Sequence, residues 1–245
     1  LCCPLGLLVF FFLFVFMRRA AVRSVPRSCG RQGQMCRRYR VNKPVAGEIF
    51  FNDKPLPSYG DKRLARSLSL LPQILVSPEG ITVRKLVEYG RSPYLSHWGR
   101  LGQEDKSIVE QAMQQTGVSE FADKSVESLS GGQRQRAWIA MVMAQDTEVV
   151  MLDEPTTYLD MSHQVELMNL MQQMNAQGKT VVVVLHDLNQ ASRYCDHLIV
   201  LEQGQLVAPG SPDEVLTASL RDEVFDLKAK IFNDPISNTP MCVAI

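Results

Sequence analysis

A serine and two glycines at the start of a helical run could bind an anion. Ser130, Gly131 and Gly132 stand directly before QRQRAWIAMVMAQ, whose composition favours a helix. The first N–H groups of a helix have no partner within it, and glycine leaves them open to a phosphate. The three residues alone are also typical of an ordinary helix cap. They therefore indicate phosphate chemistry only if other residues support it.

Two adjacent carboxylates, Asp153 and Glu154, follow the apolar run that begins at Val149. Such a run is typical of a buried parallel strand, and ligands bind at the carboxyl ends of these strands. Asp153 suits a contact with Mg²⁺, directly or through water, and Glu154 suits activation of an attacking water. The alternative is a solvated acidic pair at a strand end.

A histidine and a glutamine follow two further apolar segments. His186 ends the run VVVVLH, so it should lie on the same sheet edge as the carboxylates. A lone histidine is more often structural than functional. Gln73 follows LSLLP, and its position alone carries no functional information.

The strings that contain these residues resemble the motifs of the ATP-binding subunits of ABC transporters. LSGGQRQR, residues 129–136, resembles the signature sequence, and LDEPTTYLD, residues 152–160, resembles the Walker B motif and D-loop. Gln73 matches the Q-loop glutamine and His186 the switch histidine. The four motifs follow the family order, which outweighs the cap and the solvated-pair alternatives.

The resemblance implies ATP and Mg²⁺ as cofactors and gives each residue a role. Glu154 polarises the attacking water, His186 steadies the γ-phosphate, and the signature closes over nucleotide held by a second subunit. The catalytic set is Glu154, His186 and Gln73, the metal set is Asp153 and Gln73, and the cofactor-binding set is Ser130, Gly131, Gly132, Gln133 and Asp160.

A phosphate-binding loop of the form G-x-x-x-x-G-K-[ST] is absent from the sequence. The family spacing places its lysine near Arg31, and no Ser or Thr follows there. In such loops the backbone cradles the phosphates and the lysine neutralises them. Because these contacts stabilise the transition state, we expect weak ATP binding and slow hydrolysis.

Strands that alternate with helices predict an α/β fold with a parallel sheet. Helical spacing over residues 81–120 predicts a helical insert, and Ser211 opens a capping box. The resemblance implies a P-loop NTPase-like ABC ATPase core, a helical subdomain near residues 75–145, and an incomplete N-terminal β region. A hairpin is expected around Gly204, and core packing is expected for the stripe Met161, Met168, Met171 and Met174.

Residues 1–43 differ from the rest of the chain. They hold nine of the 26 Lys and Arg residues and no Asp or Glu. The apolar run that ends at Met17 is at the short limit for a membrane anchor. Residues 18–43 show neither a helical nor a strand period, which is typical of a sequence read in a shifted frame. We expect that residues 1–43 do not pack natively and that the ABC ATPase domain spans residues 44–245.

Composition excludes two classes of function. Residues 44–245 carry a net charge of −9, which argues against broad nucleic-acid binding. The six cysteines show no C-x-x-C pair and no histidine at zinc-ligand spacing, so we expect no cysteine metal site.

Residues 77–105 resemble the helical subdomain of the ATPases that import siderophores, ferric citrate and cobalamin. This implies an ATP-binding subunit that couples hydrolysis to uptake of ferric citrate or another iron(III) chelate. Its partners would be membrane permease subunits, a second ATPase subunit arranged head to tail and, indirectly, a periplasmic binding protein. It would lie peripherally on the cytoplasmic face of the bacterial inner membrane. The alternatives are a catalytically dead subunit, an importer of cobalamin or haem, and a soluble ABC protein without a transport role.

Overall fold

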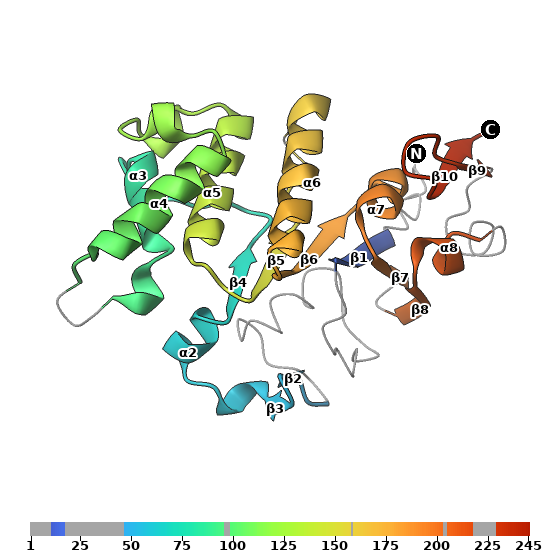
Figure 1. Ribbon diagram of the computed structural model, residues 1–245, viewed down its shortest axis with the longest axis horizontal. Helices are drawn as coiled ribbons and strands as arrows, with labels where there is room; N and C mark the ends of the chain where they lie inside the picture. The colour runs from blue at the N-terminus through green and yellow to red at the C-terminus, as the bar shows by residue number, and fades with distance from the viewer. Residues whose placement is uncertain (1–10, 18–46, 96–98, 158, 203–204, 218–228) are drawn as a thin grey trace, which may run out of the picture.

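The fold is built on a six-stranded sheet with the strand order β4-β5-β6-β1-β7-β8 (Figure 1). The computed structural model describes residues 11–17, 47–95, 99–157, 159–202, 205–217 and 229–245. The strands of this sheet are β1 (Phe11–Met17), β4 (Leu68–Leu71), β5 (Val149–Asp153), β6 (Thr180–Leu185), β7 (His197–Glu202) and β8 (Gln205–Gly210).

Strands β4, β5 and β6 are parallel, as the continuous apolar runs predicted. Leu71 pairs with Leu152, and Asp153 pairs with Val184, so the carboxyl ends of the three strands lie at one edge. Nearly every residue of β5 and β6 is buried. Parallel strands need cover on both faces, and this burial shows that they have it.

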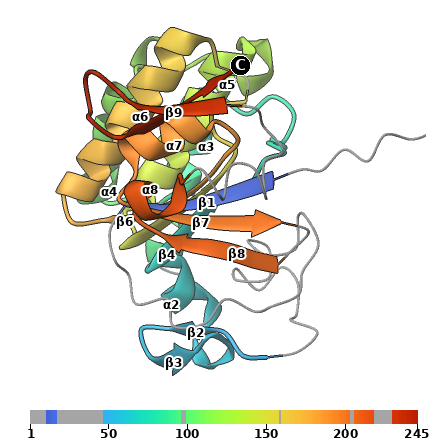
Figure 2. The same cartoon turned by 90° about the vertical axis from the view of Figure 1, so that its right-hand side faces the viewer.

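Helices α6 (Met161–Ala176) and α7 (Leu188–Tyr194) cover one face of the sheet (Figure 2). The predicted methionine stripe is confirmed for the three members that pack against this face, which are Met168, Met171 and Met174. The prediction is wrong for Met161, which is 81% exposed. Met161 is the first residue of α6, and the first turn of this helix lies beyond the carboxyl edge of the sheet.

The opposite face is covered by a short segment that precedes β4. Strands β2 (Phe50–Phe51) and β3 (Lys54–Pro55) form a hairpin, and α2 (Asp61–Ala65) follows it. Leu56, Tyr59 and Leu64 pack against the strand residues Met151 and Val182. Between β1 and β4, this small hairpin is the β structure that the described residues show.

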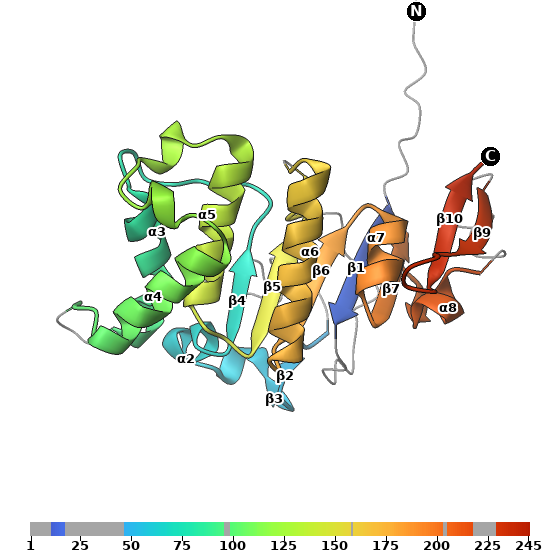
Figure 3. The same cartoon turned by 45° about the horizontal axis from the view of Figure 1, so that its top comes forward.

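Three helices gather beside β4 around a hydrophobic cluster of their own (Figure 3). They are α3 (Val83–Tyr89), α4 (Gln103–Gln115) and α5 (Gly131–Ala144). The helical insert expected over residues 81–120 is therefore present, and its boundaries near 75 and 145 stay a prediction. The 3₁₀ turns of the chain are Leu56–Ser58, Ser92–Tyr94, Ser119–Phe121 and Val126–Ser128.

Strand β1 lies within residues 1–43 and is paired in the sheet, while the expectation that this segment as a whole does not pack natively stays a prediction. Phe11–Met17 pairs antiparallel with both β6 and β7, in the middle of the sheet. A position between two strands must satisfy backbone groups on both sides, and a continuous apolar run suits it. The remainder of residues 1–43 lies outside the described residues. None of the helices in the described ranges is long and apolar enough to span a membrane.

The chain ends in a hairpin that packs on α7. Its strands are β9 (Ala229–Asn233) and β10 (Pro240–Ala244). The Asn189 amide donates to the Cys242 carbonyl at 3.0 Å and accepts from the Cys242 N–H at 2.8 Å, as a neighbouring strand would. Before this hairpin, α8 (Pro212–Val215) has the capping box predicted at Ser211. The hairpin predicted around Gly204 is confirmed by β7 and β8, which pair antiparallel, although Gly204 itself lies outside the described residues.

Candidate functional site

The three residues predicted to be catalytic meet at the carboxyl edge of the parallel strands. The Gln73 side-chain N–H donates to Glu154 Oε2 at 2.8 Å. The His186 Nε2 atom lies 2.7 Å from Glu154 Oε1. The Glu154 side chain is 8% exposed, whereas that of His186 is 46% exposed. Glu154 is therefore a shielded carboxylate at the centre of this cluster.

The backbone of Glu154 is in the left-handed region, with φ 48°. For a residue with a side chain this conformation costs on the order of 1–3 kcal/mol and persists only where its surroundings fix it. The Thr157 hydroxyl donates to the Glu154 carbonyl at 3.2 Å, and Gln135 donates to the Pro155 carbonyl at 3.1 Å. These contacts hold the loop that points the carboxylate toward His186.

Asp153 is the last residue of β5 and lies beside Glu154. Burial raises its pKa, the Glu154 carboxylate raises it further, and His186 lowers it in part. A divalent cation would relieve this repulsion. Gln73 gives its nitrogen to Glu154, so its oxygen is the atom oriented to serve as a metal ligand. A carboxylate and an amide oxygen fit Mg²⁺, which takes its remaining ligands from water and phosphate.

The signature residues begin α5. The Ser130 hydroxyl accepts from the Gln133 N–H at 3.3 Å, and the Gln133 side-chain oxygen accepts from the Ser130 N–H at 3.1 Å. This capping box occupies two groups and leaves the N–H groups of Gly131 and Gly132 at the helix start. The arrangement is both a helix cap and an anion site, so the two readings do not exclude each other.

Asp160 caps the next helix rather than facing the catalytic cluster. The backbone N–H of His163 lowers the pKa of Asp160 most, followed by the Ser162 hydroxyl. The carboxylate accepts both of these bonds at 3.0 Å, and His163 Nδ1 lies 2.7 Å from it. Its predicted contact with nucleotide stays a prediction.

The structure does not supply the missing phosphate loop. Leu13 pairs with Leu185 and Met17 with Val181, so β1 runs away from the edge that carries His186. A phosphate loop follows the carboxyl end of its strand, and that end of β1 lies at the opposite edge. The segment around Arg31 lies outside the described residues. Mg²⁺ fits the edge, but the described residues form no cradle for the phosphates of ATP.

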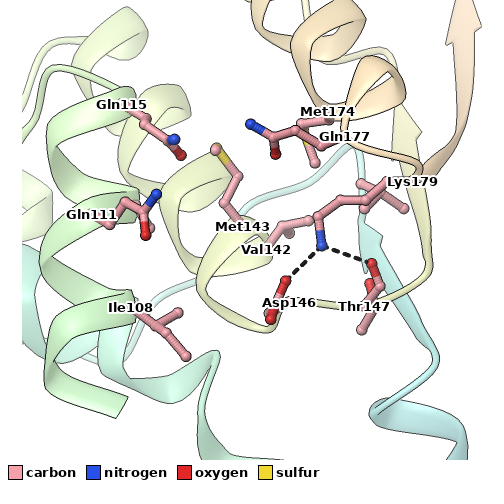
Figure 4. Close-up of a pocket in the computed structure, with 12 residues that line it drawn as sticks. Ile108, Gln111, Gln115, Val142, Met143, Asp146, Thr147, Met174, Gln177 and Lys179 are labelled. Carbon is pink, nitrogen blue, oxygen red and sulfur yellow. Dashed lines mark hydrogen bonds and ion pairs between the residues drawn. The ribbon is translucent and has the colours of Figure 1, made fainter. Parts of the chain in front are cut away.

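A cavity of about 110 Å³ lies at the other edge of the sheet, between α4, α5 and α6 (Figure 4). Lys179 is one of its lining residues and donates to Asp146 at 2.6 Å and to the Thr147 carbonyl at 3.1 Å. Several lining residues directly precede strands β5 and β6, whereas Asp153 and His186 lie at the opposite ends of these strands. The cavity is therefore separate from the catalytic cluster.

Sequence reasoning missed three glutamines that touch the loop after Glu154 or each other. They are Gln135, Gln164 and Gln190, which lie in the first turns of α5, α6 and α7. Two of them bond to backbone carbonyls, which no residue pattern reports. The string LSGGQRQR contained one of them without indicating its partner.

Comparison with known proteins places this geometry in a family. The ABC transporter family model matches residues 39–157. The iron(3+)-hydroxamate import ATP-binding protein FhuC of Bacillus subtilis is 42% identical, over 89% of this chain and 81% of that protein. The chain belongs to the ABC transporter family. It is an ATP-binding subunit of the transport-coupled ATPase type.

Two further similarities agree with this membership. The ferric enterobactin transport ATP-binding protein FepC of Escherichia coli is 44% identical, over 90% of this chain and 82% of that protein. A solved metal-chelate-type ABC transporter in an inward-facing conformation has a TM-score of 0.70 at 23% identity, over 86% of this chain and 80% of that one. This structural likeness confirms the ABC ATPase fold, with its α/β core and parallel strands.

Proposed function

We propose that this chain is the ATP-binding subunit of an importer that takes up an iron(III) chelate of the siderophore type. The observation that carries the proposal is an identity of 42–44% to two subunits named for such transport, over about four-fifths or more of each chain. The meeting of Gln73, Glu154 and His186 at one sheet edge supports it, because hydrolysis needs a shielded base there.

In this proposal each residue of the cluster has one task. Glu154 takes the proton of the attacking water, and its low exposure keeps bulk water from competing. His186 contacts the carboxylate at 2.7 Å, and its half-exposed side chain lies where it can meet a bound group. Asp153 and the Gln73 oxygen hold Mg²⁺, which would supply charge neutralisation at the phosphates when bound.

The subunit works within an assembly on the cytoplasmic face of the bacterial inner membrane. A second ATPase subunit lies head to tail, and Ser130, Gly131 and Gly132 contact the nucleotide that it holds. Membrane permease subunits dock beside Gln73, where Ile74 and Val76 are 71% and 75% exposed. A periplasmic binding protein delivers the chelate to the permease and does not touch this chain, which is not expected to bind nucleic acid.

Ferric citrate is the finer proposal for the cargo. It is supported by the resemblance of residues 77–105 to ferric citrate and related import ATPases. The two relatives are named for a hydroxamate and for enterobactin, so identity alone does not separate one chelate from another. Cobalamin and haem are the alternative cargoes. An ATP-binding subunit does not contact the chelate, which leaves the decision to transport measurements.

A second candidate function is a subunit that does not hydrolyse ATP itself but completes the site of an intact partner. The missing G-x-x-x-x-G-K-[ST] loop and the direction of β1 favour it. In that case Ser130 matters and Glu154 does not. The two candidates therefore differ in which single substitution abolishes transport.

The test is uptake of radioactive iron by bacteria that lack their own chelate-import ATP-binding subunits and carry this chain with its permease and binding protein. Iron is supplied as citrate, hydroxamate, enterobactin or haem complexes. The proposal expects uptake of one iron(III) chelate that Glu154→Gln abolishes, with ferric citrate the preferred cargo. Uptake that Glu154→Gln leaves intact and Ser130→Arg abolishes would establish the second candidate. No uptake of any chelate by the folded chain would refute the importer proposal.

A further inference from the structure

Three helices that start at functional motifs each place a glutamine at the loop after Glu154 or beside it. Gln135 of α5 donates to the Pro155 carbonyl at 3.1 Å. Gln164 of α6 donates to the Leu159 carbonyl at 3.0 Å and to the Thr156 carbonyl at 3.3 Å. These bonds hold the carbonyls of Pro155, Thr156 and Leu159 from two sides.

Gln190 of α7 extends this set to the histidine. Its side-chain N–H donates to the Gln164 oxygen at 2.8 Å. Its backbone N–H donates to Asp187 at 3.1 Å, and Asp187 is the residue directly after His186. Because His186 in turn contacts Glu154, the contacts form a closed ring that runs from Glu154 through the loop, two glutamines and the histidine.

The orientation of the two amides is fixed by this ring. Gln164 accepts through its oxygen and donates through its nitrogen, so a flipped amide would place N–H against N–H. The Gln190 oxygen is buried and has no hydrogen-bond partner among the described residues. Leaving a buried acceptor unpaired is energetically unfavourable. Gln190 keeps its nitrogen on Gln164 although its oxygen is left unpaired, and this supports a positioning role for the contact.

We propose that Gln164 and Gln190 are positioning residues that set the distance between Glu154 and His186. A displacement of the Thr156 and Leu159 carbonyls would then shift Gln164, Gln190 and, through them, His186. The two side chains touch each other and backbone carbonyls rather than the reacting atoms. The proposal rests on the roles given above to Glu154 and His186, and its test measures their contact and not turnover.

The probe is diethyl pyrocarbonate, which acylates a free imidazole nitrogen, read for each histidine by mass spectrometry of the intact folded chain. In the parent protein the Glu154 carboxylate contacts Nε2 of His186, and this contact should slow acylation at that nitrogen. Gln190→Met keeps the shape of the side chain and removes the bridge. It should raise the acylation rate of His186 roughly five- to tenfold, as expected for the loss of about one hydrogen bond of restraint. The rate of His197 should stay constant.

The matched control is Asn189→Leu, on the same helix. It removes two bonds of similar length to the terminal hairpin and leaves the bridge intact. Its His186 rate should stay within about twofold of the parent. An unchanged rate in Gln190→Met, or an equal rise in Asn189→Leu, would overturn the proposal, because the effect would be absent or would come from general loosening of α7.

Gln164 provides a second arm. Gln164→Glu still accepts from Gln190 but no longer donates to the two carbonyls, so it should raise the His186 rate as Gln190→Met does. The double variant Gln164→Met with Gln190→Met should be no faster than either single variant, since each breaks the same ring. Effects that multiply in the double variant would show that the residues act separately and would refute the bridge.

Discussion

Arg91→Met tests how the helical part that carries the signature is held together. Arg91 donates to Asp105 at 2.8 Å and to the Ala144 carbonyl at 3.0 Å, and its guanidinium lies 3.9 Å from the Tyr94 ring centroid. It thus joins the end of α3 to the start of α4 and the end of α5. The Arg91 and Asp105 side chains are 7% and 18% exposed.

The magnitude follows from that burial. Removing one partner of a buried ion pair costs about 3–5 kcal/mol, because the other charge stays behind unpaired. Asp105 keeps part of its hydration, so we expect the lower end, about 3 kcal/mol. Lys85→Met is the control, since the Lys85–Glu88 pair has exposures of 58% and 21%. An exposed pair contributes about 0–1 kcal/mol.

The assay is urea unfolding followed by circular dichroism, with midpoints compared at equal slope. Combining Arg91→Met with Asp105→Leu should recover part of the loss, because the stranded carboxylate is then gone. The reasoning is refuted if Arg91→Met costs no more than Lys85→Met, or if the second substitution adds its own loss in full.

Three further predictions concern packing, pH and thiol reactivity. In Gly90→Ala the new Cβ would overlap a backbone carbonyl oxygen of α5, so unfolding should need about 3 kcal/mol less, whereas Gly60→Ala, with open space around it, should be nearly neutral in the same urea assay. Burial raises the pKa of Asp105, but the adjacent guanidinium and a backbone N–H lower it more, so the net pKa lies below its usual value. The stability that the ionised Asp105 contributes is present above its unfolded pKa, about 4, and is lost as pH falls through its folded pKa. In a pH series, the free energy of unfolding should therefore fall less steeply with acid in Asp105→Asn than in the parent protein. Burial raises the pKa of Cys195 well above its usual value, so iodoacetamide should label the native protein at Cys242 before Cys195. Equal labelling rates of these two cysteines by mass spectrometry would contradict the buried position of Cys195.

The catalytic edge could be predicted because each of its residues follows an apolar strand. Parallel strands bring their carboxyl ends together, so Gln73, Glu154 and His186 had to meet once the strands were recognised. The capping box at Ser211 could be predicted because its two partners lie three residues apart in the sequence. These features depend on local spacing alone.

The remaining features depend on contacts that spacing does not encode. Gln164 and Gln190 come together from different helices, and one of them bonds to backbone carbonyls, which any residue could supply. Strand β1 was not predicted because its apolar run also fits a short membrane anchor. That run, rich in aromatic residues, suits a strand with neighbours on both sides, and the sheet has such a position between β6 and β7.

The most direct test of the account is ATP turnover by the purified chain at saturating Mg²⁺ and ATP, beside Glu154→Gln and a control in the distant cavity, Gln111→Ala. The account predicts slow turnover, because the phosphate loop is missing. Glu154→Gln should abolish this turnover, and Gln111→Ala should leave it unchanged. Turnover that survives Glu154→Gln, or none above the level of that variant, would contradict the claim that this edge of the sheet is a working ATPase site.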